Sequence, residues 1–343
     1  MSSRGGNSAQ NITMAATAMF LVGTLAGVSD LIQNYPVHGG QAMRYAAGAA
    51  ALLVLARLLG RRLLRPTLRE WLRLLALTLT GLIVFNVAVI ESARHAGPAL
   101  VGTVLGTVPL ALALLGGRRP APHVLAGACV VVTGATIATG LGSGNLPALL
   151  WALVALACEV AFSLLALPLL PRLGAVLVSA YSTALSVPLF LVLGLVTDGA
   201  GMLRVPTLPE AGGLAYLAIA VTTGAFFLWY TALPRLGPAV AGLFAGMIPV
   251  GAIVTGLLLG VAVPTPGDLA GAGLVIAGIA VGLYGGRVIR ALAVRRNLNR
   301  AERPAGAGTP GDDRGGRRDD ARVRLHRPAA AGPRRDGVPA DHH

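Results

Sequence analysis

The sequence predicts an all-α membrane protein whose ten transmembrane helices form two five-helix repeats of inverted topology. Three observations predict this: an apolar composition, ten apolar runs of spanning length, and glycines and prolines that recur at a fixed offset. The mean hydropathy is +0.71 and only 12% of the residues are charged, whereas a soluble domain carries about 25%. The composition therefore argues against an ordinary soluble enzyme and indicates a chain that lies mostly in lipid.

Loop signals divide most of the chain into ten apolar runs, each near the length of about 20 residues that a helix needs to cross a bilayer. The runs cover residues 12–31, 39–60, 70–91, 97–117, 123–141, 147–167, 174–196, 211–232, 238–260 and 266–286. With the N-terminus in the cytoplasm, the outer loops contain only Arg94 and Arg204, and the arginine-rich loops lie inside, as is usual. Both termini are therefore predicted to be cytoplasmic.

The remaining charge is concentrated at the C-terminal end. None of the 28 basic residues is a lysine, which is typical of GC-rich bacterial genomes and points to a bacterial inner membrane, and 14 of these arginines follow Gly285. Residues 287–343 cannot bury apolar area and are predicted to be a disordered cytoplasmic tail. Its first arginines are expected to lie along anionic lipid headgroups, and no nucleic-acid partner is expected. The preceding segments are the N-terminus (1–11), the first repeat (12–141) and the second repeat (147–286).

Glycines and prolines recur between the two repeats. Gly97-Pro98 matches Gly237-Pro238 at an offset of 140, and beyond Pro109 the offset becomes 144. Proline suits the first turn of a helix, and glycines four residues apart let a second helix approach closely. The residues predicted to pack helices together are Gly97, Pro98, Gly102, Gly106 and Pro109 in the first copy and Gly237, Pro238, Gly242, Gly246 and Pro249 in the second.

Each repeat contains five runs, an odd number, so the second repeat begins on the opposite side of the membrane. Two inverted halves can rock around a central site and alternate its access between the two sides. This arrangement favours a secondary transporter for a small molecule. A channel or a non-transporting membrane scaffold is the alternative, although a channel would more naturally show a repeated ring of carbonyls or charges.

These features resemble the EamA-type members of the drug/metabolite transporter superfamily. The segment Ala232–Pro238 is similar to the turn that precedes the ninth helix of that family, Arg44-Tyr45 to an Arg-Phe element in its second helix, and Asn86 to a polar residue in its third. Many members carry Gly-Glu where this chain has Gly116-Gly117 and Gly260-Val261, which departs from the commonest subgroups. The resemblance covers about residues 14–286 and implies export or exchange of small metabolites, amino acids or drugs.

Enzymes and ATP-driven pumps are not expected. The six histidines lie in loops, at helix ends or in the tail, so neither a Ser–His pair nor a zinc site is available at depth in the membrane. A phosphate-binding loop of the Walker type needs a lysine, which the chain lacks. The sequence therefore predicts no catalytic residue, no metal site and no cofactor.

Asp30 and Arg44 are the charged residues expected near the outer end. At 1.5 Å per residue, both reach the outer third of consecutive helices. We expect them to approach each other or to share a polar vestibule, because an unpaired charge there is costly. Their role is either an ion pair that closes the outer end or, for Arg44, an outer gate or a contact with a substrate carboxylate.

A polar and aromatic lining is expected around a central cavity. Its candidates are Tyr45, Asn86, Tyr181, Trp229 and Tyr230. Tyrosine and tryptophan combine an apolar face with a hydrogen-bonding tip, and a buried amide such as that of Asn86 needs partners. Packing, or anchoring at the membrane interface, is the alternative role for each aromatic residue.

Glu159 is the one acid placed near the middle of the bilayer. It lies about twelve residues into the sixth run, roughly 18 Å from the outer side of a core about 30 Å thick. Burial disfavours a charged carboxylate, so this group could bind and release a proton as a site changes sides. The residue is a candidate for proton or substrate binding, and a hydrogen-bonded structural glutamate is the alternative.

Overall fold

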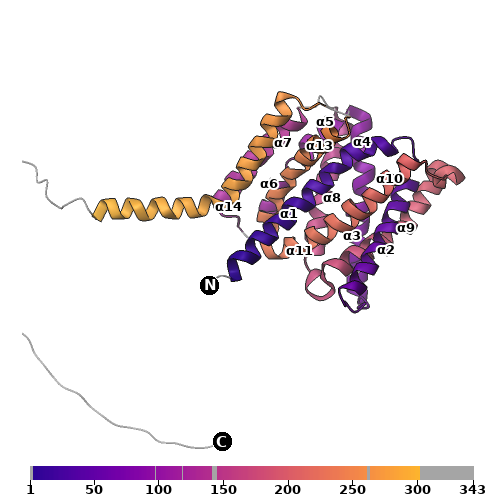
Figure 1. The fold of residues 1–343 in the computed structure, drawn as a ribbon, viewed down its shortest axis with the longest axis horizontal. Helices are drawn as coiled ribbons and strands as arrows, with labels where there is room; N and C mark the ends of the chain where they lie inside the picture. The colour runs from indigo at the N-terminus through magenta and orange to yellow at the C-terminus, as the bar shows by residue number, and fades with distance from the viewer. Residues whose placement is uncertain (1–2, 97, 118, 141–144, 261–262, 302–343) are drawn as a thin grey trace, which may run out of the picture. The chain divides into compact units, whose positions relative to one another are not determined.

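The computed structural model describes residues 3–96, 98–117, 119–140, 145–260 and 263–301, and every regular element within these ranges is helical (Figure 1). Residues Met1–Val294 form one compact body, and Arg295–His343 form a second unit, of which the structure describes only a helical segment. The elements are α1 (Ser3–Val28), η1 (Ser29–Ile32), α2 (Val37–Leu58), α3 (Leu68–Thr78), η2 (Leu79–Val84), α4 (Phe85–Ala96), α5 (Pro98–Leu105), α6 (Val108–Leu115), α7 (Pro122–Thr139), α8 (Leu146–Ala166), α9 (Leu170–Asp198), η3 (Gly199–Leu203), α10 (Leu208–Tyr216), η4 (Leu217–Ala225), α11 (Phe226–Leu236), α12 (Pro238–Gly242), η5 (Leu243–Gly246), α13 (Met247–Leu258) and α14 (Pro266–Ala301).

Seven helical stretches in the described ranges are long and apolar enough to cross a membrane. They are Ser8–Val28, Leu68–Ala96, Leu146–Ala166, Leu170–Leu203, Leu208–Leu236, Pro238–Leu258 and Pro266–Gly286. The shorter apolar helices Leu100–Leu115 and Pro122–Ala138, together with α2, fall on the three other runs expected from the sequence. The all-α membrane class is therefore confirmed, and the division into ten spans stays a prediction.

Four helices differ in detail from the expected runs. The third and eighth runs each contain a π-helical stretch, η2 and η4. The fourth run breaks between α5 and α6, where the Thr107 backbone N–H and hydroxyl both donate to the Val104 carbonyl, at 3.0 and 2.7 Å. Helix α14 continues past residue 286 to Ala301, and the arginine-rich tail beyond that point lies outside the described residues.

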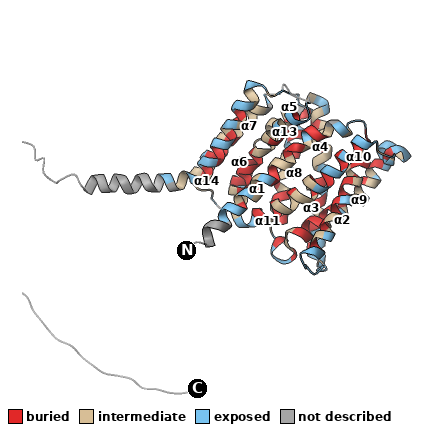
Figure 2. Cartoon of the chain, viewed as in Figure 1, coloured by how far each residue is buried: buried red, intermediate tan, exposed pale blue. Residues whose placement is uncertain are grey.

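The helices of the main body pack in pairs that join distant parts of the chain. Helix α2 packs along α9, α1 packs along α13 and α11, and α8 packs along α4. Figure 2 shows buried residues concentrated where the helices face one another, with exposed residues on the outside of the body. Many of the exposed residues are large and apolar, for example Leu150, Leu195 and Ile219. Such a surface is compatible with contact with lipid.

Helices α7 and α14 meet backbone to backbone at glycines. A Cβ atom on Gly134 would lie 2.7 Å from the Gly271 carbonyl oxygen, and one on Gly278 would lie 2.9 Å from the Gly127 carbonyl oxygen. The offset of 144 that relates the two sequence repeats converts Gly127 into Gly271 and Gly134 into Gly278. The offset therefore converts the Gly134–Gly271 contact into the Gly278–Gly127 contact. A two-fold axis through the α7–α14 interface would relate the two contacts in the same way.

The other predicted packing residues of the repeat also lie at helix contacts. An added Cβ on Gly242 would lie 3.0 Å from Leu112, one on Gly246 2.5 Å from Val131, and one on Gly106 3.1 Å from Ala135. Pro109 is buried, Gly102 and Pro249 are half-buried, Gly237 has a φ of 78°, and Pro238 lies against Gly116. Gly97 and the side chain of Pro98 lie outside the described residues.

Two similar carboxylate clusters begin α3 and α10. Thr67 and Glu70 form a capping box at the start of α3, and Thr207 and Glu210 form one at the start of α10, again at an offset of 140. In both, the glutamate accepts a hydrogen bond of 2.7 Å from the threonine backbone N–H. Glu70 is ion-paired with Arg172, and Glu210 with Arg204. We call these two clusters the ion-paired capping boxes.

The ion-paired capping box at Glu70 is expected to stabilise the fold. Replacing Glu70 by alanine should lower the free energy of unfolding by about 1 kcal/mol or more, since a hydrogen bond to a charged group contributes about 1.5–3 kcal/mol. The change removes the N3 half of the capping box and the partner of Arg172. Glu91→Ala is the matched control, since the partner of Glu91 in the described part of the chain is Arg94, whose side chain is 70% exposed. Thermal unfolding in detergent measures the difference. Equal melting temperatures for the two variants would show that the cluster contributes nothing.

Candidate functional site

A cavity of about 1180 Å³ lies among the start of α1, the end of α2, the start of α9 and the length of α11. We call it the large cavity. Its lining residues are Gln10, Asn11, Met14, Leu59, Arg61, Arg62, Leu64, Leu170, Pro171, Arg172, Leu173, Gly174, Ala175, Val176, Leu177, Phe227, Tyr230, Thr231, Pro234 and Arg235. The volume is sufficient for a small organic molecule, since ligand sites commonly measure about 300–1,000 Å³.

The charges that line the large cavity are all positive. Its four charged residues are arginines, and no carboxylate is among the described residues that line it. Arg172 is neutralised by Glu70, and Arg235 donates to the Asn11 side-chain oxygen at 3.0 Å. Arg61 and Arg62 are exposed. The mouth of the cavity therefore has a net positive charge.

Aromatic and polar groups meet at the α8–α11 contact beside the cavity. The rings of Phe162, Phe226 and Tyr230 pack together, with centroids 5.2–6.3 Å apart. The Tyr230 hydroxyl, the Trp229 indole N–H and the Ser163 hydroxyl are buried without a hydrogen-bond partner among the described residues. Glu159 is partly buried on α8 and lies close enough to Tyr230 to interact with it electrostatically. Unsatisfied buried polar groups of this kind are uncommon and can receive a ligand or water.

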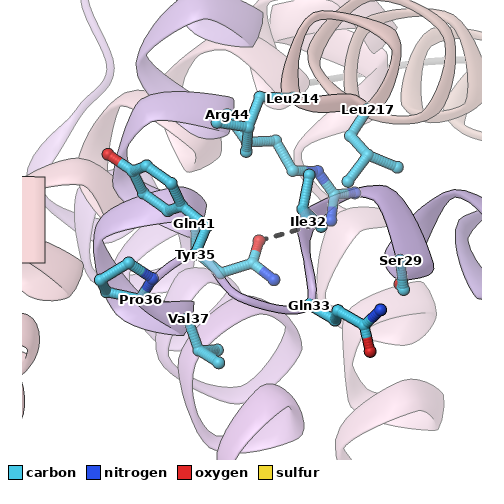
Figure 3. A pocket seen from close by; sticks show the side chains of 11 residues that line it. Ser29, Ile32, Gln33, Tyr35, Pro36, Val37, Gln41, Arg44, Leu214 and Leu217 are labelled. Atoms are coloured by element: carbon cyan, nitrogen blue, oxygen red, sulfur yellow. Dashed lines mark hydrogen bonds between the residues drawn. The ribbon is translucent and has the colours of Figure 1, made fainter. Parts of the chain in front are cut away.

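A second pocket of about 170 Å³ lies at the opposite ends of α1 and α2 (Figure 3). We call it the small pocket. It is lined by Ser29, Ile32, Gln33, Tyr35, Pro36, Val37, Gly40, Gln41, Arg44, Leu214 and Leu217. Burial raises the pKa of the Tyr35 hydroxyl, so the hydroxyl stays protonated and donates to the Arg204 carbonyl at 2.7 Å. This bond closes one side of the pocket.

Four polar side chains form a chain of hydrogen bonds beside the small pocket. Arg44 is buried, and its Nε donates to the Thr222 hydroxyl at 2.8 Å. Its Nη1 donates to the Gln41 oxygen at 3.4 Å, drawn as a dashed line in Figure 3. The Gln41 nitrogen donates to the Asn86 oxygen at 3.3 Å, and the Asn86 nitrogen donates to the Leu82 carbonyl at 2.6 Å. The network joins α2, α4 and η4.

The structure separates the predicted site residues into two groups. Arg44, Tyr45 and Asn86 lie together near the small pocket, with the Arg44 guanidinium 5.1 Å from the centre of the Tyr45 ring. Tyr230 lines the large cavity, Glu159 lies close enough to Tyr230 to interact with it, and Trp229 is buried next to Tyr230 in α11. Tyr181 lines neither pocket itself, but its hydroxyl donates at 2.8 Å to the carbonyl of Leu64, which lines the large cavity, and its ring packs on Trp71. The Asp30 side chain lies outside the described residues.

Gln41 and Thr222 take part in the polar network and were not anticipated. Gln41 lies three residues before Arg44, on the same face of α2. This spacing could have indicated that the two side chains meet. Thr222 is 178 residues from Arg44 along the chain and lies in a π-helical stretch, so no local pattern relates the two residues.

Comparison with known proteins identifies the class of transporter. Residues 146–284, which run from α8 into α14, match the EamA-like transporter family. This part of the chain is therefore similar to the EamA-like transporters. The uncharacterized transporter YetK of Bacillus subtilis (strain 168) is 25% identical over 257 residues, which cover 71% of this chain and 78% of YetK. These similarities confirm the resemblance that the sequence motifs indicated.

A crystal structure with 22% sequence identity shares the fold of this chain. It superimposes with a TM-score of 0.71 and covers 81% of this chain and 98% of its own. This likeness extends beyond residues 146–284, so the shared fold includes both halves of the apolar region. The protein is therefore a multi-pass membrane transporter.

Proposed function

We propose that the protein is a secondary transporter that moves a small metabolite, amino acid or drug across the bacterial inner membrane by alternating access, in the direction of export. Ten spans form two inverted five-helix repeats around the transport path. Both termini lie in the cytoplasm, so the large cavity opens to the cytoplasm and the small pocket faces the periplasm.

The unequal opening of the two ends is the observation that carries this proposal. The cavity at the start of α1 measures about 1180 Å³, and the pocket at its other end measures about 170 Å³. At that narrow end, Arg204 donates to the Asn34 carbonyl at 3.2 Å and Tyr35 bonds to Arg204. A carrier open on one side and closed on the other has this form, whereas an open channel connects both sides at once.

Two pairs of equivalent contacts support the inverted arrangement. The α7–α14 glycine contacts exchange under the offset of 144, as expected for antiparallel helices related by a two-fold axis in the membrane plane. The ion-paired capping boxes lie at opposite ends of the molecule, since Arg172 lines the large cavity and Arg204 lies against Tyr35 of the small pocket. Equivalent elements of inverted repeats are expected on opposite sides.

The orientation gives a topological prediction. In a background with Cys129→Ser and Cys158→Ala, Arg65→Cys should react with a membrane-impermeant maleimide only from the cytoplasm. Leu208→Cys should react only from the periplasm, because it starts α10 at the other end of the body. Labelling of intact cells and of inside-out vesicles measures both. Labelling at position 65 from the periplasm would reverse the proposed orientation.

Alternating access is tested at Tyr230, in the wall of the large cavity. In the same background, a Tyr230→Cys protein should react with the impermeant maleimide from either face, because each conformation opens the site to one side. Leu59→Cys, at the exposed cytoplasmic mouth, is the control and should react from the cytoplasm alone. Reaction at position 230 from one face only would contradict alternating access.

Steady conductance of the reconstituted protein would favour a channel, and the absence of both counterflow and conductance would favour a scaffold.

A further inference from the structure

Arg44 is a buried cation that has no carboxylate partner among the described side chains. Arg44 is 5% exposed. None of the ion pairs among the described side chains includes it. A guanidinium has five N–H donors, and two of them are used, on the hydroxyl of Thr222 and the amide oxygen of Gln41. Donors and positive charge are therefore available to a ligand.

Burying a lone charge is costly unless a partner compensates it. The neutral oxygens of Thr222 and Gln41 accept hydrogen bonds from the Arg44 guanidinium. These bonds satisfy two of its N–H groups but do not neutralise its positive charge. The guanidinium lines the small pocket (Figure 3), so the pocket is where a compensating anion would bind. Arginine suits carboxylates in particular, because its planar fork matches their two oxygens.

The rest of the small pocket suits the organic part of such an anion. Ser29, Gln33 and Gln41 give it polar groups, and no acidic residue is among the described residues that line it. Ile32, Leu214 and Leu217 give it an apolar wall. The volume of about 170 Å³ matches a molecule of the size of an amino acid or a benzoate better than a large drug.

The lining of the large cavity independently favours an anionic ligand. Arg61, Arg62 and Arg235 line it without a carboxylate partner in the described part of the chain, and Arg172 alone is neutralised. A cleft lined by charges of one sign raises the local concentration of the opposite ion. Both ends of the transport path therefore favour an anion.

We infer that the transported solute is a small organic carboxylate and that the guanidinium of Arg44 binds its carboxylate in the small pocket. The inference rests on the proposed transport function and names its substrate class. The neighbouring Gln41 and Thr222 side chains hold the guanidinium in place, and Asn86 orients Gln41. Arg44 is thus a binding residue, and the other three position it.

The test measures protection of a cysteine at the rim of the small pocket. A Gln33→Cys protein in the Cys129→Ser, Cys158→Ala background is purified in detergent and labelled with maleimide. Three carboxylates (benzoate, lactate and glutamate) are compared with their neutral amides (benzamide, lactamide and glutamine). At least one carboxylate should slow labelling by about tenfold or more at concentrations where its amide has no effect, since hydrogen bonds to a charged group are worth about 1.5–3 kcal/mol, and 1.4 kcal/mol is tenfold.

The Arg44 variants decide which residue is responsible. Arg44→Gln should abolish the protection, and Arg44→Lys, which keeps the charge and loses the fork, should weaken it. Arg94→Gln removes an exposed arginine that is paired with Glu91 and should leave protection unchanged. Protection by the amides, protection that survives Arg44→Gln, or no protection by any of the three carboxylates would overturn the inference. The Tyr230 labelling is independent of these ligands, so failure of the inference is distinguishable from failure of alternating access.

Discussion

A Glu159→Gln variant is expected to fold and insert normally and to lose the pH dependence of transport. Glu159 is partly buried on α8, beside the unpartnered Tyr230 hydroxyl at the edge of the large cavity. Glutamine keeps the shape of glutamate and removes the group that titrates. A carrier coupled to one proton accumulates its solute by about tenfold for each unit of pH difference, because both correspond to about 1.4 kcal/mol. The variant should fall to no net accumulation.

The measurement is uptake into proteoliposomes with and without a pH gradient, alongside counterflow at equal pH. Counterflow should persist in Glu159→Gln, since exchange of solute for solute needs no proton. Glu91→Gln is the control, because Glu91 lies on α4 and pairs with the exposed Arg94, and this variant should accumulate solute as the parent does. If Glu159→Gln still accumulates solute in response to the gradient, another group carries the proton.

A Gly271→Val variant is expected to be strongly destabilised. A Cβ on Gly271 would lie 2.6 Å from the Gly134 carbonyl oxygen and 2.5 Å from the Ala138 nitrogen, and neither backbone atom can move without shifting α7. Overpacking typically costs about 1–3 kcal/mol, and we expect the upper end of that range because two helix backbones are forced apart. The loss should be seen as a lower melting temperature and as less folded protein in the membrane.

Gly273→Val is the matched control for this prediction. Gly273 lies on the same helix two residues away, and an added Cβ there would meet no atom within 4 Å. Both substitutions change helix propensity equally, so the difference between them reports the α7–α14 contact alone. Equal stability of the two variants would mean that the glycine contact is not a structural requirement.

The apolar runs could be predicted from the sequence, because their length and their flanking glycines and prolines have local causes. The close contact between α7 and α14 at Gly134 and Gly271 was not predicted, because a recurring glycine does not by itself say which helix it faces. The sequence placed Arg44 near the outer end with Asp30 and placed Asn86 in the lining of a central cavity. It did not predict that Gln41 links Arg44 to Asn86.

The remaining features depend on contacts that local patterns do not record. Gln41 joins Arg44 to Asn86 because α2 and α4 approach each other at that level, and one polar residue in an apolar run does not reveal its partner. Tyr181 was expected to line the cavity, and its hydroxyl donates to the carbonyl of Leu64, which lines the large cavity, a partner that no local pattern indicates. The role of each predicted site residue is still to be measured, and the variants above are chosen for that purpose.

The two π-helical stretches determine where the polar groups of the site point. A π turn holds more residues than an α turn, so residues after it are rotated relative to an uninterrupted helix, by about 100° for one additional residue. Asn86 follows η2 directly, and Trp229 and Tyr230 follow η4. Deleting one residue within 79–84 would thus turn the Asn86 amide away from Gln41 while leaving every other side chain chemically intact. The specificity of this site depends on the lengths of these helices as well as on their residues.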